Sequence, residues 1–241
     1  MRNVFSAPTA LFADLGLTAT CLLLLGGTIQ AQELKDQVAA VLGQADSVAA
    51  AEIYPLADEL ADVAPDRNLD GYRTAIMATA GQSDSSRQRL CAALAFAQLK
   101  EDSTFGKDLI ALLDPVVAKA DEFERSAALS ILGEERLYNT RMLTKVRKLV
   151  REQCENELVS PRVRIEAALS LWKVGTNKDL ETAKGVLEQF LQSTDRDLQQ
   201  RGALALAEIN TEGGKAWQIT PARCRAFARR PAESWLSASP W

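Results

Sequence analysis

A short phrase rich in alanine and leucine recurs four times in this 241-residue chain. The copies align without a gap, and successive copies are 35, 40 and 35 residues apart. A repeat of this length is typical of helical arrays, in which each unit stacks on its neighbours to bury an apolar face. This periodicity constrains the fold more than any other feature of the chain. The copies cover residues 92–96, 127–131, 167–171 and 202–206.

Each copy of the phrase lies in the first helix of a predicted pair of helices. In the third unit, Ser160 and Pro161 have the residue types of an N-cap and a first helical position. That helix is expected to run to about Val174, and Gly175 begins the turn to a second helix with apolar residues at helical spacing. Other first helices are expected over residues 85–99, 123–132 and 194–210, and other second helices around residues 109–117 and 142–150. The sequence therefore predicts an all-α fold, an α-solenoid of stacked antiparallel helical hairpins.

The third copy carries the most specific pattern. Residues 163–171 read Val-Arg-x-x-Ala-Ala-x-Ser-Leu, which resembles the Val-Arg-x-x-Ala-Ala-x-Ala-Leu phrase of HEAT and HEAT-like repeats. Glu124 and Gln199 stand where Arg164 stands in this copy, and Trp172 replaces the usual small residue, so the ladder of stacked Arg and Asp that the family forms is expected to be incomplete. The resemblance covers about residues 85–210. It implies a curved scaffold whose second helices line a concave, partner-binding surface, and it implies no single chemistry.

Residues 1–31 are predicted to be an export signal. Arg2 provides a positive start, an apolar run follows, and Ile29 and Ala31 stand three and one residues before a cleavage site. The alternative is an uncleaved membrane anchor, but Asp14 interrupts a run that is shorter than the roughly 20 residues needed to span a bilayer. We therefore expect export to the periplasm or envelope of a bacterium, with no stable membrane span after cleavage.

The rest of the chain is expected to fall into three parts. Residues 32–83 form an N-terminal helical cap or degenerate repeats, and residues 84–210 form about three and a half HEAT-like repeats. Residues 211–241 hold three of the four tryptophans, several arginines and no apolar period. This tail has three interpretations: the truncated or frame-shifted end of a longer repeat protein, a genuine basic and aromatic tail, or a short cap helix near residues 221–230.

The composition excludes several kinds of chemistry. The chain has no histidine, so it cannot form a Ser-His-Asp or Cys-His nucleophile system or a histidine-ligated zinc site by itself. It also has no glycine-rich phosphate loop and no calcium-binding loop. We therefore predict no catalytic, cofactor-binding or metal-binding residues. The net charge of −4 gives no overall attraction to nucleic acid.

A scaffold for protein–protein interaction is thus the predicted function, with a protein partner of unknown identity. The alternative is the N-terminal repeat arm of a larger exported enzyme, for example a protease. A relationship to HEAT-like lyases or hydroxylases is disfavoured by the expected export and, for a histidine-ligated metal, by the absent histidine. The candidate partner-binding residues are Arg141, Lys145 and Lys148, which lie at i, i+4 and i+7 of one predicted helix. The competing interpretation is an ordinary solvated helix face.

Three cysteines, Cys91, Cys154 and Cys224, remain after the predicted cleavage. They are too far apart in sequence for a CxxC metal or redox motif, and an odd number leaves at least one unpaired. Cys91 and Cys154 either form a disulfide or are two ordinary helix cysteines, and both possibilities stay open at this point.

Overall fold

The computed structural model describes residues 31–64, 69–99 and 104–212. Within these ranges the chain is helical and contains no β-strand, which confirms the predicted all-α class. Predictions for residues 1–30 and 213–241, which include the export signal and nearly all of the tail, lie outside the described residues.

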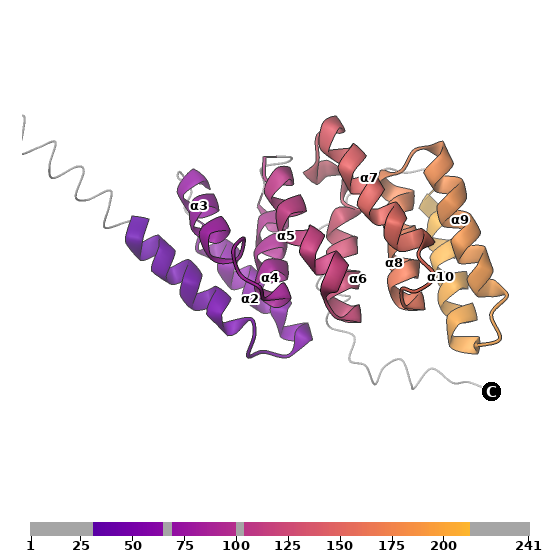
Figure 1. Cartoon of the computed structure of the whole chain (residues 1–241), viewed down its shortest axis with the longest axis horizontal. Helices are drawn as coiled ribbons and strands as arrows, with labels where there is room; N and C mark the ends of the chain where they lie inside the picture. Colours follow the sequence, from indigo (N-terminus) through magenta and orange to yellow (C-terminus); the bar gives the residue numbers. More distant parts are fainter. Residues whose placement is uncertain (1–30, 65–68, 100–103, 213–241) are drawn as a thin grey trace, which may run out of the picture.

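The helices follow one another with short connections (Figure 1). A first helix spans residues 31–44, and it is followed by η1 (Ala50–Glu52), α2 (Ile53–Asp62) and α3 (Leu69–Thr79). The repeated region contains α4 (Ser86–Gln98), α5 (Gly106–Lys119), α6 (Glu122–Leu132), η2 (Glu135–Leu137), α7 (Thr140–Glu155), α8 (Pro161–Val174), α9 (Asn177–Leu191) and α10 (Arg196–Glu212). Each helix expected from the repeats is present, and η2 is an addition that the sequence did not predict.

Side-chain caps explain where several of these helices begin. The oxygen of Ser160 accepts a hydrogen bond from the backbone N–H of Val163 at 3.5 Å, with Pro161 in the first turn of α8 as expected. Ser85, Asp121 and Asn139 cap α4, α6 and α7 in the same way. Each cap satisfies a backbone donor that would otherwise lack an intrahelical partner. The helix boundaries are therefore encoded locally.

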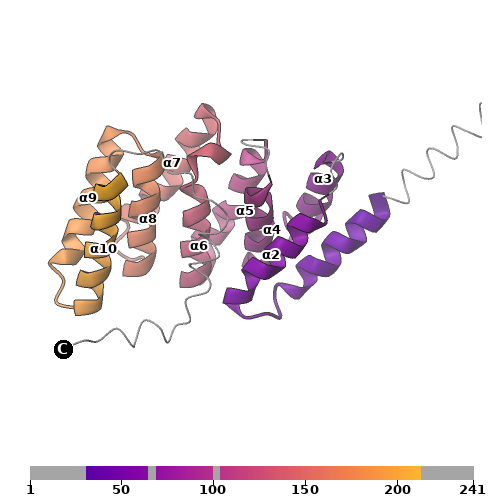
Figure 2. The same cartoon turned by 180° about the vertical axis from the view of Figure 1, so that it is seen from behind.

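The helices alternate between two rows. In one row α4, α6, α8 and α10 pack against one another in chain order, and in the other α5, α7 and α9 do the same. Figures 1 and 2 show the two rows from opposite sides, with α7 and α9 in front in the first view and α8 and α10 in front in the second. Each helix of one row also packs against its chain neighbours in the other row. The core is the continuous apolar layer between these contacts.

The repeated phrase lies at the contacts within the first row. The alanine preceding each phrase leucine is fully buried in α4, α6 and α8, where it is Ala93, Ala128 and Ala168. In α8, Ser170 donates a hydrogen bond of 2.7 Å to the carbonyl oxygen of Leu129 in α6, so consecutive copies touch. Small side chains at these positions let the helices approach closely, as the sequence predicts.

The phrase in α10 begins with a glycine instead of an alanine. A Cβ atom added to Gly202 would lie 2.9 Å from the Cβ of Phe190 in α9, closer than real Cβ atoms come to a neighbouring atom. Glycine is needed here for close helix approach, since α10 packs tightly on α9.

Candidate interaction surface

Helix α7 carries five basic residues, and the structure divides them into two groups. Arg147 donates to the carbonyl oxygen of Val174 at the end of α8, and Arg151 binds the carboxylate of Asp179 in α9. Both guanidinium groups are thus engaged in contacts between helices. The other three are the predicted residues Arg141, Lys145 and Lys148, and all three are exposed. We call these three residues the basic stripe.

Two members of the basic stripe have acidic neighbours. The Nζ of Lys145 lies 3.7 Å from an oxygen of Asp114 in α5, and the Nζ of Lys148 lies 3.9 Å from Glu152 one turn further along α7. These are exposed, single-contact ion pairs, which contribute at most about 1 kcal/mol and break easily. The lysines therefore remain available to a partner, although acidic side chains stand beside them.

The opposite face of α7 fixes the orientation of the basic stripe. Leu143, Val146, Val150 and Cys154 recur at intervals of three and four residues and are all buried. This apolar face packs against α8, and Asn139 caps the start of the helix with a 3.0 Å hydrogen bond to the N–H of Met142. The basic stripe consequently sits on a helix that is anchored along its whole length.

Three buried carboxylates form a second set of polar contacts, which the sequence did not predict. Each lies in the first turn of its helix and is bound by an arginine from the α-helix two places earlier in the chain. The pairs are Arg73–Asp108, Arg87–Glu124 and Arg151–Asp179, with distances from arginine Nε to carboxylate oxygen of 2.5, 3.0 and 2.8 Å. A buried carboxylate stays charged only when it is paired and hydrogen-bonded, so these contacts tie adjacent units together.

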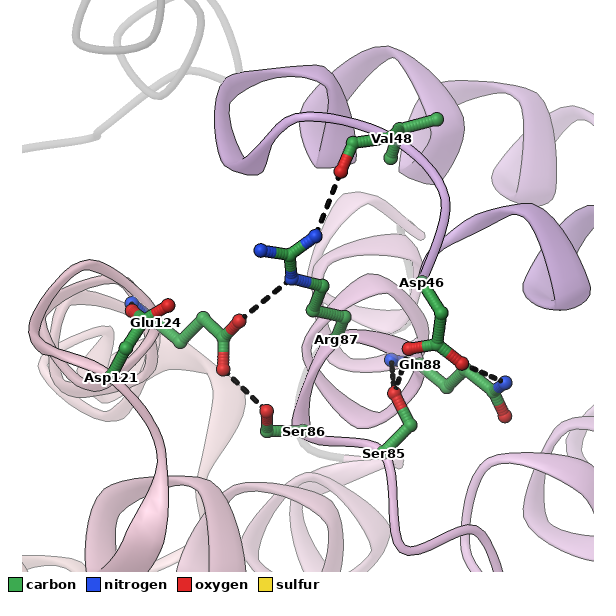
Figure 3. A network of polar contacts seen from close by, with 8 residues as sticks. All are labelled: Asp46, Val48, Ser85, Ser86, Arg87, Gln88, Asp121 and Glu124. Atoms are coloured by element: carbon green, nitrogen blue, oxygen red, sulfur yellow. Dashed lines mark hydrogen bonds and ion pairs between the residues drawn. The ribbon is translucent and has the colours of Figure 1, made fainter.

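The pair between α4 and α6 is the centre of a larger network (Figure 3). One oxygen of Glu124 accepts from Arg87 and the other accepts from Ser86, both in the first turn of α4. The backbone N–H of Glu124 donates to its own N-cap, Asp121, at 2.9 Å. A second nitrogen of Arg87 donates to the carbonyl oxygen of Val48 at 2.8 Å. Arg87 therefore links the starts of two helices to the turn that precedes η1.

Asp46 ties the same turn to α4 a second time. It accepts hydrogen bonds from the hydroxyl of Ser85 and, at 2.8 Å, from the side-chain amide of Gln88 (Figure 3). The N-terminal helices are thus joined to the first repeated unit through polar contacts as well as through the packing of α2 on α4.

Burial raises the pKa of a carboxylate, and hydrogen bonds or nearby cations lower it, so the net shift depends on the partners. Burial alone would raise the pKa of Asp179, but hydrogen bonds from the N–H and hydroxyl of Thr176 and from Arg151 lower it below its ordinary value. Burial raises the pKa of Glu134, which the attraction of Arg136 and then Lys173 only partly opposes, and burial raises the pKa of Glu166, which the attraction of Lys173 only partly opposes. Lys173 itself lies 3.8 Å from Glu208 in α10.

Cys91 and Cys154 are both free and buried, so the structure contains no disulfide between them. Burial raises the pKa of each thiol to about 12, which leaves almost no reactive thiolate at neutral pH. The interpretation as two ordinary helix cysteines is confirmed. Cys224 lies outside the described residues.

An open groove of about 510 Å³ lies at the last described end of the two rows, among α8, α9 and α10. Apolar side chains from all three helices line it, and charged residues of α9 stand beside them. The apolar residues are Trp172, Leu180, Leu191, Leu206 and Ile209, and the charged residues are Glu181, Lys184 and Glu188. This groove could not be predicted from the sequence, because its residues come from helices that meet only in the folded chain.

No helix within residues 31–64, 69–99 and 104–212 is long and apolar enough to cross a membrane. In the same described part of the chain, no group of three or more His, Cys, Asp or Glu side chains is placed to hold a metal ion. Comparison with profiles of known protein families, with curated proteins and with solved structures finds no match to this chain.

Proposed function

We propose that this protein is a non-enzymatic, exported scaffold that binds a protein partner through the basic stripe of α7. In this proposal the hairpins α4–α5, α6–α7 and α8–α9 are HEAT-like repeats of an α-solenoid. The alternation of helices between two rows and the burial of the phrase alanines at successive contacts support this. Export to the periplasm or envelope of a bacterium rests on the predicted signal at residues 1–31.

The proposal rests on the division of the basic residues of α7 into an engaged pair and an exposed basic stripe. Arg147 and Arg151 are held in hydrogen bonds to other helices. The three that remain exposed follow one another at i, i+4 and i+7, and Lys145 among them contacts another helix through the single 3.7 Å ion pair to Asp114. The surrounding body is acidic, since residues 31–212 have a net charge of −8. A local positive strip on an acidic body favours a partner with an acidic surface. Such complementarity steers association and suppresses wrong partners.

The test compares two triple charge reversals in capture from an envelope extract of the source organism, followed by cross-linking and identification of the bound protein. The first variant combines Arg141→Glu, Lys145→Glu and Lys148→Glu. The control makes the same change of charge at exposed positions elsewhere, Lys119→Glu, Arg162→Glu and Arg196→Glu. Both variants should retain the helical circular dichroism of the parent, because all six side chains are exposed.

We expect one acidic protein to be captured by the parent and the control and to be lost from the basic-stripe variant. Raising the salt concentration from 50 to 300 mM should weaken its capture, because exposed charges are then screened. Undiminished capture by the basic-stripe variant would refute the proposal. Equal loss in both variants would also refute it, since the effect would then follow overall charge and not the basic stripe.

A further inference from the structure

The alanine and leucine at the centre of the repeated phrase are buried in α4 and α6 and exposed in α10. Ala168 of α8 is 0% exposed, whereas Ala203, at the same phrase position in α10, is exposed. Leu129 of α6 is likewise fully buried, whereas the corresponding Leu204 is 56% exposed. In α4, α6 and α8 the next helix of the row packs beside the phrase. No described element does so for α10. The apolar groove among α8, α9 and α10 lies on a neighbouring face of the same helix, since Leu206 and Ile209 line it and Ala203 and Leu204 do not.

The residues that follow α10 differ in composition from the described array: they are basic and rich in aromatic side chains. Residues 213–241 contain five basic residues and one acidic residue, while residues 31–212 have a net charge of −8. They also contain Trp217, Phe227, Trp235 and Trp241. Aromatic side chains bury large apolar areas, and arginines pair well with carboxylates such as Glu181 and Glu188 beside the groove.

We propose that residues 213–241 dock into the groove among α8, α9 and α10, so that the chain covers the end of its own array. The segment starts next to the groove, because Ile209 of α10 is one of the residues that line it. A chain of this length spans up to about 95 Å when extended, and α9, with 15 residues, is only about 22 Å long. The whole groove is therefore within reach.

Charge favours this segment over a second copy of the array as the occupant. Two bodies of net charge −8 repel each other, whereas the segment is positive and the groove is lined by two carboxylates, Glu181 and Glu188, and one lysine, Lys184. The covalent connection also gives the segment an effective concentration near the millimolar range, which a separate molecule seldom reaches. This inference goes beyond the proposed partner binding, which uses a different helix.

Amide hydrogen exchange and limited trypsin cleavage of the full chain test the docking. In the parent we expect slowed exchange in residues 213–241 and slow trypsin cleavage after Arg223, Arg225 and Arg229. Leu206→Asp places a charge in the groove and should speed cleavage at these sites at least tenfold. Leu158→Asp makes the same change at a side chain that is 96% exposed and remote in sequence, and it should have no effect.

A second pair of variants covers the case in which Leu206→Asp unfolds α10. Glu181→Lys with Glu188→Lys reverses two exposed charges beside the groove, and Glu155→Lys with Glu157→Lys reverses two exposed charges elsewhere. Only the first pair should release the segment. Exchange of residues 213–241 at the unprotected rate in the parent would overturn the proposal, and so would equal protection in all variants. If the protection of residues 213–241 from exchange rose with protein concentration, and a dimer mass appeared at the same time, the proposal would be wrong and the groove would bind a second copy of the chain.

Discussion

Replacing Ala168 by leucine tests the packing of the repeats most directly. Ala168 is 0% exposed in α8, which packs against α6 on one side and α10 on the other. Leucine adds three carbon atoms, and if space existed their burial would contribute roughly 2.4 kcal/mol to stability. Neighbouring atoms cover Ala168 completely, so we expect the added atoms to push a neighbouring helix away. Overpacking of this kind costs about 1–3 kcal/mol net.

Urea and thermal unfolding followed by circular dichroism at 222 nm measure this cost. For a chain of this size, a loss of about 1–3 kcal/mol lowers the midpoint temperature by roughly 2–12 °C. The control is Ala111→Leu at an exposed position of α5, where alanine and leucine have similar helix propensity and the change should stay within about 0.5 kcal/mol. If Ala168→Leu were as stable as the control, the tight contact inferred for the phrase would be wrong.

Two further predictions concern buried ionisable groups. Asp179→Asn should lower the free energy of unfolding by about 1–3 kcal/mol at pH 7, because the charged bond to Arg151 is lost. The folded pKa of Asp179 lies below its unfolded value of about 3.9, so its stabilisation is present above pH 4 and disappears as the pH falls through the folded pKa. The difference between parent and variant in urea titrations should therefore shrink below pH 4, and a constant difference would contradict this. Cys91 and Cys154 should resist alkylation by iodoacetamide at pH 7.5 in the folded chain and react once urea unfolds it. Mass spectrometry measures the labelling. Rapid labelling of either thiol in the folded chain would contradict its burial.

The local parts of the fold could be predicted from sequence because local interactions determine them. Ser160 and Pro161 begin α8 where their residue types indicate, and the apolar spacing around Val146 identifies the buried face of α7. Periodicity and capping both act within a few residues, so a single sequence displays them. The exposure of the basic stripe was predictable for the same reason, since it follows from the helical period.

Contacts between units could not be read from the sequence in the same way. The sequence shows Glu124 three residues after Asp121, which indicates a helix start, but nothing near it identifies Arg87 as its partner 37 residues earlier. Where Glu124 replaced the arginine of the repeat phrase, we expected only a gap in the family's ladder of stacked Arg and Asp. The structure instead places Glu124 in a buried ion pair between units. The inward role of Arg147 was hidden for the same reason, because Val174 is distant in sequence.

The two kinds of contact between units favour the same register. Apolar packing disfavours a slide of α8 by one turn, because Arg164 or Trp172 would then take the buried place of Ala168. A slide of one turn moves a helix by 5.4 Å, which is beyond hydrogen-bond reach. Such a shift would separate Arg87 from Glu124 and Arg151 from Asp179, and it would leave two buried carboxylates without their cations, at a cost of several kcal/mol each. The buried ion pairs thus reinforce the register that apolar packing favours, and by fixing α7 against α9 they also fix the surface that displays the basic stripe.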